Sequence, residues 1–76
     1  MMDEVRPGIY QHYKGKEYEV VGVAKHSETL EELVIYKALY NTEEFPFGQL
    51  WVRPYKMFLE ILEIDGKETP RFNKVE

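Results

Sequence analysis

The chain has 76 residues, of which 10 are basic and 14 acidic, so that its formal net charge is −4, and it contains no cysteine. This length predicts a single domain over residues 1–76, near the lower end of what folds alone. So short a chain buries only about 60% of the surface that it exposes when unfolded. The missing cysteines exclude disulfides and thiolate metal sites, and the acidic balance argues against nucleic acid as a partner.

Residues 1–4, Met-Met-Asp-Glu, are acidic and lack the apolar run of a secretory signal peptide. No later stretch approaches the roughly 20 apolar residues that a membrane span requires. We therefore expect a cytoplasmic protein without membrane contact. The two histidines, His12 and His26, are not spaced like the ligands of a standard zinc site, so we expect no metal and no cofactor.

The first predicted elements form a hairpin. A strand over 8–13 is followed by a turn over 14–16, where glycine permits positive φ, and by a second strand over 17–24. Alternation along the second strand places four residues on one face: Tyr18, Val20, Gly22 and Ala24. The other face begins with glutamates and ends with valines, which predicts a strand that becomes covered on both sides and bends at its glycine.

Residues 26–29, His-Ser-Glu-Thr, offer the imidazole, hydroxyl and carboxylate of a hydrolase. A catalytic hydroxyl needs its base within hydrogen-bond reach, whereas neighbours in an extended chain point to opposite faces, so His26 is badly placed to activate Ser27. A polar turn explains the same residue types, with Ser27 or Thr29 capping backbone amides and His26 bonded to a neighbour. We favour the turn, and keep ligand binding and catalysis as alternatives.

Residues 30–40 are compatible with a helix or with a strand. A helix would place Lys37 on its apolar stripe, whereas the Val-Ile-Tyr sequence at the centre favours a strand over 33–40. Thr29 and Glu32 fit a capping box, so a single helical turn before the strand is a further possibility.

The rest of the chain continues the β pattern. Pro54 ends a short strand and suits the start of a helical turn, and Asp65-Gly66 is a typical hairpin turn. We expect, in order, a loop over 41–48, a strand over 50–53, a helical turn over 55–57, a strand over 58–64 and a return strand over 68–72. About five strands with one short helical turn predict an all-β protein, a small and strongly bent SH3-like barrel.

Several motifs stand together in this chain: GIYQHYKG at 8–15, HSET at 26–29, LWVRP at 50–54 followed by Met57-Phe58, and PRF at 70–72. Over about residues 7–72 the chain resembles the small bacterial family known as domain of unknown function 1653. The resemblance implies a stand-alone bacterial domain with a compact β-barrel fold. It implies no activity and no catalytic residue.

Aromatic residues and Arg53 provide a second functional signal. Tyrosine and tryptophan favour sites that are buried at one end and wet at the other, as in binding surfaces, although a small core also needs them. Arg53 stands in a rigid extended stretch, where it could receive a phosphate or carboxylate or pair with Glu28 or Glu32. We predict a shallow groove beside the turn at 26–29, lined by six residues: His26, Ser27, Glu28, Tyr36, Trp51 and Arg53.

We therefore expect a non-enzymatic module that binds a small molecule or a protein. One alternative is a small hydrolase-type enzyme with His26 or His12 as its base. Another is recognition of nucleic acid or a nucleotide through Trp51, the tyrosines, Arg53 and Arg71, although the net charge makes nucleic acid a poor partner. An exposed barrel edge permits either a monomer or an edge-paired homodimer.

Overall fold

A computed structural model describes residues 5–76 of the chain, and in this part it contains seven strands and one short helix. These are β1 (Gly8–His12), β2 (Glu17–Lys25), β3 (Glu32–Ala38), β4 (Leu50–Pro54), α1 (Tyr55–Phe58), β5 (Ile61–Ile64), β6 (Lys67–Pro70) and β7 (Phe72–Lys74). The predicted all-β class is confirmed. The expectation drawn from residues 1–4 lies outside the described residues.

Five of the strands form one antiparallel sheet in the order β4-β3-β2-β1-β7, and β5 and β6 form a separate hairpin. No backbone pairing joins the edge strands β4 and β7 within residues 5–76, so the expected barrel is strongly bent but open. Side chains bridge the two edges instead, because the guanidinium of Arg53 on β4 lies over the Phe72 ring on β7, 5.8 Å from its centroid.

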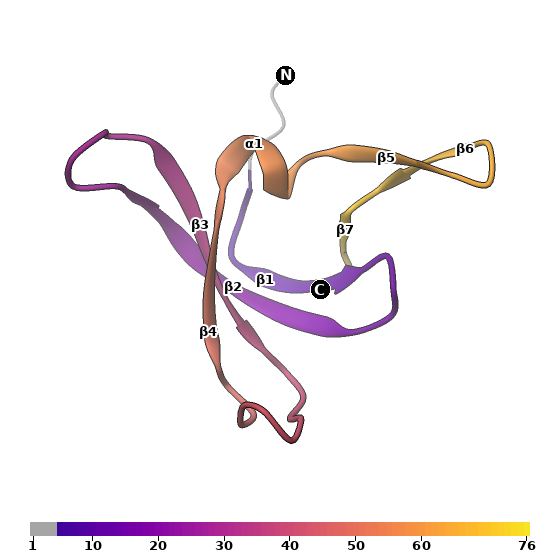
Figure 1. The fold of residues 1–76 in the computed structure, drawn as a ribbon, viewed down its shortest axis with the longest axis horizontal. Coiled ribbons are helices and arrows are strands. Elements are labelled where there is room, and N and C mark those ends of the chain that lie inside the picture. The colour runs from indigo at the N-terminus through magenta and orange to yellow at the C-terminus, as the bar shows by residue number, and fades with distance from the viewer. Residues whose placement is uncertain (1–4) are drawn as a thin grey trace.

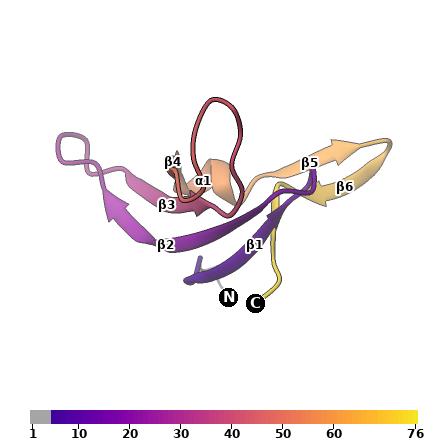
Figure 2. The same cartoon turned by 90° about the horizontal axis from the view of Figure 1, so that it is seen from below.

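Three projections extend from the centre of the molecule: the β2–β3 turn, the loop between β3 and β4, and the β5–β6 hairpin (Figure 1). The loop between β3 and β4 rises away from β1 and β2 (Figure 2). These projections make the radius of gyration 12.9 Å, whereas a compact chain of this length is expected near about 11 Å.

The core lies on the concave face of the sheet, which we call the inner face. Its buried residues are Tyr10, Val20, Val34, Tyr36, Ala38, Phe58 and Phe72. Phe58 of α1 fills the space between the sheet edges, stacked on Phe72 with 4.2 Å between ring centroids and 8° between planes. The helix therefore covers the open side of the sheet with one side chain.

The helical turn was predicted correctly, but its extent was not. Pro54 precedes α1 with φ −52°, a value suited to a helix start, and the chain remains helical through Phe58. The expected strand from residue 58 therefore begins only at Ile61, and its return ends at Pro70 rather than at residue 72. Within residues 5–76, no helix is long and apolar enough to cross a membrane.

A β-bulge in β2 changes the predicted faces of that strand. Val20 lies opposite Tyr36 and Gly22 lies opposite Ile35, so Val21 is an extra residue. Beyond the bulge the side chains exchange faces, and Val23 joins the inner face opposite Val34. The expectation of a strand covered on both sides is also wrong, because Val21 and Val23 are 53% and 41% exposed.

Two other local predictions are confirmed. Residues 32–38 form the strand β3, not a helix. Asp65 and Gly66 have φ values of 53° and 78°, as a two-residue hairpin turn with both residues at positive φ requires.

Candidate functional site

The His-Ser-Glu-Thr segment forms the polar turn between β2 and β3. The His26 Nδ1 atom accepts hydrogen bonds from the backbone N–H groups of Glu28 (3.1 Å) and Thr29 (3.4 Å). The turn closes with a bond from the Leu30 N–H to the His26 carbonyl (2.8 Å), and Leu30 has φ 64°. The imidazole thus caps the turn itself, and the turn contains no helix.

His12 has the same role at the turn between β1 and β2, where its Nδ1 accepts the N–H of Lys14 at 3.1 Å. Its ring also contacts Phe72, with 5.0 Å between centroids. Burial lowers the pKa of His12 below 6.5, and the positive charges of Arg53, Arg71 and Lys14 lower it further. The imidazole is therefore neutral at pH 7, and because Nδ1 is the acceptor, the proton lies on Nε2.

Arg53 projects from β4 onto the inner face, where it lies opposite Val34 in the register of β3 and β4. Its Nε donates to the Tyr36 hydroxyl at 3.2 Å. The expected pairing with Glu28 or Glu32 is absent, and Glu32 instead approaches Lys25 at 3.9 Å. Among residues 5–76 the half-buried guanidinium of Arg53 has no carboxylate partner.

Arg71 provides a contrast to Arg53. It also belongs to the charges that act on His12, but its Nη2 lies 2.6 Å from a carboxylate oxygen of Glu60. Its Nε is buried without a hydrogen-bond partner. One of the two arginines near His12 is therefore neutralised by contact, and Arg53 is not.

Tyrosines extend this polar region along the inner face. The hydroxyls of Tyr18 and Tyr40 lie 2.5 Å apart, and burial together with this hydrogen bond raises the pKa of Tyr18. The Lys16 ammonium lies over the Tyr40 ring, 4.9 Å from its centroid. We call the whole set the inner cluster: His12, Tyr18, Tyr36, Tyr40, Trp51, Arg53 and Phe72.

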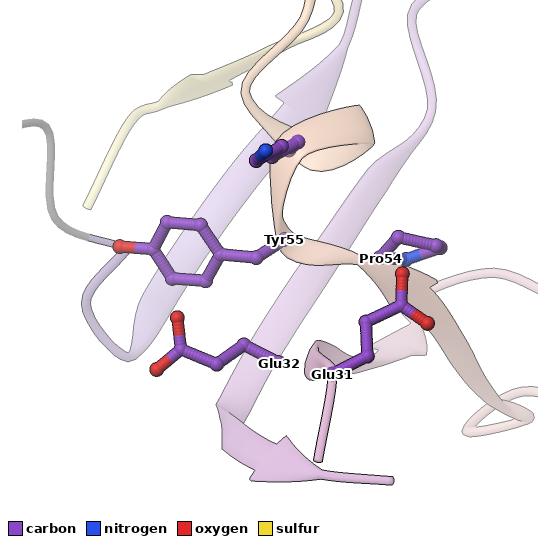
Figure 3. Close-up of a pocket in the computed structure, with 5 residues that line it drawn as sticks. Glu31, Glu32, Pro54 and Tyr55 are labelled. Carbon is purple, nitrogen blue, oxygen red and sulfur yellow. The ribbon is translucent and has the colours of Figure 1, made fainter. Parts of the chain in front are cut away.

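A depression of about 370 Å³ lies apart from the inner cluster, where the β2–β3 turn approaches α1. Its lining residues are Glu31, Glu32, Pro54, Tyr55 and Lys56. Figure 3 shows the two carboxylates beside the rings of Pro54 and Tyr55. The Tyr55 hydroxyl accepts the N–H of Val5 at 3.0 Å, so this residue also holds the chain before β1. A second depression, of about 450 Å³, lies along the β5–β6 hairpin.

A model of the family described as "Protein of unknown function (DUF1653)" matches residues 8–74. The chain belongs to this family. A crystal structure of a DUF1653 protein from Bordetella bronchiseptica is 35% identical, with a TM-score of 0.84, over 99% of this chain and 92% of that one. The comparison with curated proteins finds no match.

The six predicted site residues of this DUF1653 domain fall into two groups. Tyr36, Trp51 and Arg53 lie together on the inner face, where Tyr36 stands opposite Trp51 in the register. His26 and its two successors lie on the exposed turn. Arg53 bonds to Tyr36, and neither is bonded to a residue of the turn among the described residues, so a groove shared by all six residues stays a prediction.

The structure also changes the roles that were predicted for individual residues. Tyr36 is 5% exposed and belongs to the core, so that only its hydroxyl serves the candidate site. None of the six predicted residues lines the depression beside the turn. Tyr18, Tyr40 and Phe72 were not among the six predicted residues, although the alternation of the second strand had placed Tyr18 on the face of Val20, which lies in the core. Among residues 5–76 no three acidic or imidazole side chains are grouped to hold a metal.

Proposed function

We propose that this DUF1653 domain is a non-enzymatic module that binds a small molecule through a carboxylate or phosphate group. One observation carries the proposal: Arg53 is held on the inner face without a carboxylate partner in residues 5–76. A partly buried guanidinium loses part of its hydration, and its fork of donors matches carboxylate and phosphate oxygens, which can replace that hydration. The Tyr36 bond and the Phe72 ring hold it in position before a ligand arrives.

The surroundings of Arg53 add further donors to the same region. The Nε2–H of His12 is free of the turn bond that occupies Nδ1. Lys16 stands over Tyr40 at the edge of the inner cluster. An anion bound at Arg53 would lie in the region where the His12 imidazole already feels the charge of this guanidinium, and the Lys16 ammonium at the edge of the inner cluster adds positive charge at longer range.

The contacts of the histidines favour binding over hydrolysis. A nucleophilic hydroxyl needs an imidazole base within hydrogen-bond reach. In residues 5–76 neither His12 nor His26 has a side-chain bond to a hydroxyl, because each Nδ1 accepts backbone N–H groups instead. Both histidines therefore stabilise the backbone of a turn.

Isothermal titration with inorganic phosphate and with acetate, at constant ionic strength, tests the proposal. Arg53→Gln removes the charge and is expected to weaken anion binding by about tenfold or more, as expected for a lost charge-assisted hydrogen bond. Arg53→Lys keeps the charge but loses the bidentate fork, so we expect an intermediate loss. Lys56→Gln removes one positive charge from α1, outside the inner cluster, and is the matched control.

The proposal fails if Arg53→Gln and Lys56→Gln reduce the affinity equally, since the anion would then respond only to net charge. It also fails if neither anion binds the unmodified chain. Circular dichroism of each variant separates a loss of binding from a loss of fold.

A further inference from the structure

Trp51 adds a ring to the site of Arg53. It lies two residues before Arg53 on β4, and its register with Tyr36 places both side chains on the inner face. The Cα atoms of alternate residues of a strand stand about 6.8 Å apart and their side chains share a face, so Trp51 and Arg53 leave the same face of β4. Trp51 is 36% exposed, and within residues 5–76 its one ring contact is edge-to-face with Phe45, at 5.1 Å and 83°.

The loop that carries Phe45 brings negative charge to the Trp51 end of this site. Thr42 Oγ1 accepts the N–H groups of Glu44 (3.1 Å) and Phe45 (3.2 Å), and the Thr42 N–H donates to the Phe45 carbonyl (2.9 Å). These bonds order the backbone of the loop that carries the Phe45 ring and the exposed residues Glu43 and Glu44. Arg53 thus supplies positive charge on β4, and the loop that contacts Trp51 carries two exposed acidic residues.

We infer that the ligand is a nucleoside monophosphate, with its base stacked on Trp51 and its phosphate bound by Arg53. This inference rests on the proposed function, because it uses the same guanidinium. Aromatic side chains stack on any nucleobase, and the guanidinium fork matches two phosphate oxygens. A nucleic acid strand would carry further phosphates past Trp51 towards Glu43 and Glu44, where like charges repel, so a single nucleotide is favoured.

Isothermal titration of the full chain, at constant ionic strength, compares four probes: adenosine 5′-monophosphate, adenosine, ribose 5-phosphate and inorganic phosphate. The monophosphate is expected to bind about tenfold or more tightly than ribose 5-phosphate, because only the former has a base to stack. Trp51→Ala removes this advantage, because it lowers the affinity for the monophosphate about tenfold more than the affinity for inorganic phosphate. Trp51→Leu, which keeps apolar bulk on the strand, is expected to do the same and serves if the alanine variant unfolds.

Two controls accompany these variants. Arg53→Gln weakens binding of the monophosphate and of inorganic phosphate alike. Phe47→Ala removes an aromatic ring that is 61% exposed on the same loop as Phe45, and we expect it to change neither affinity.

The outcomes separate this inference from the proposed function. Equal affinities for adenosine 5′-monophosphate and ribose 5-phosphate overturn the nucleotide inference and leave anion binding in place. Absence of binding by every phosphate probe overturns the nucleotide inference, and absence of binding by acetate as well overturns both. A single-stranded oligonucleotide that binds more tightly than the monophosphate, with an affinity that falls steeply as salt rises, overturns the single nucleotide in favour of a polymer.

Discussion

His12 and His26 perform the same task at two successive turns of the chain. Each is near the end of a strand, and each uses Nδ1 to accept the N–H of the residue two positions later, at 3.1 Å in both cases. Asn and Asp commonly make this type of bond in turns, and here an imidazole replaces their side-chain oxygen. Two residues that suggest catalysis in the sequence thus have local structural roles.

Substitution at His26 tests its role as a cap. His26→Ala leaves two turn amides without their acceptor, and we expect the free energy of unfolding to fall by about 1 kcal/mol, as for the loss of a helix cap. His26→Asn restores a side-chain acceptor at the same place and is expected to recover most of the loss. Urea denaturation measures both variants. Equal stabilities of the alanine variant and the parent chain would contradict the capping role.

At the scale of elements, α1 is the most consequential feature, because its single turn delivers Phe58 to the core. The ring is 1% exposed, stacks on Phe72 and meets Tyr10 edge-to-face at 5.4 Å. It lies between strands β4 and β7, which have no backbone pairing to each other in residues 5–76. The open side of the sheet is therefore closed by apolar packing.

Phe58→Ala tests this closure. Loss of a buried phenylalanine costs about 3–5 kcal/mol, and a domain of this length has a total stability of only about 4–11 kcal/mol. We therefore expect the variant to be largely unfolded at 37 °C by circular dichroism, and Phe58→Leu to lose roughly half as much stability or less. Phe47→Ala, at an exposed position, is the control and should change stability by about 0.5 kcal/mol or less. A folded Phe58→Ala variant with near-parental stability would contradict the closure.

Some of the local structures could be predicted from the sequence and others could not. Pro54 and Asp65-Gly66 act through their own backbone geometry, so the helix start and the last hairpin were predicted correctly. Gly22 predicted a bend in the second strand, and a bulge lies beside it at Val21. The helical state of Phe58 depends on tertiary packing, and no local pattern encodes it. The family resemblance predicted a match over about residues 7–72, and the family model matches 8–74.

At the scale of the whole molecule, the bend of the sheet creates the inner cluster. Arg53 on one edge strand and Phe72 on the other come together only because the five strands curve around the core. The sequence predicted Arg53 and Trp51 as site residues beside the turn of His26, whereas the contacts of Arg53 in the structure are with Tyr36 and Phe72. The spacing of residues along the chain does not reveal which ends of distant strands meet, so His26 was grouped with Arg53 and His12 was not.

The charges around His12 give the inner cluster a pH dependence. The groups that face this imidazole are Arg53 on β4, Arg71 before β7, Lys14 in the turn and the rings of Tyr13 and Tyr18. Because folding lowers the pKa of His12 below 6.5, the unfolded chain binds the proton more readily, and stability declines as pH falls from above 6.5 through the folded pKa. An anion bound at Arg53 offsets the positive charges and favours protonated His12.

The most direct measurement is therefore an NMR titration of the His12 imidazole, with and without inorganic phosphate. We predict that phosphate raises the pKa of His12, that its affinity increases as pH falls through that pKa, and that the amide signals of residues 12, 53 and 72 shift. In Arg53→Gln, the pKa of His12 is already higher and responds little to phosphate. An unchanged pKa of His12, with shifts confined to the depression lined by Glu31 and Lys56, would contradict the assignment of the inner cluster as the binding site.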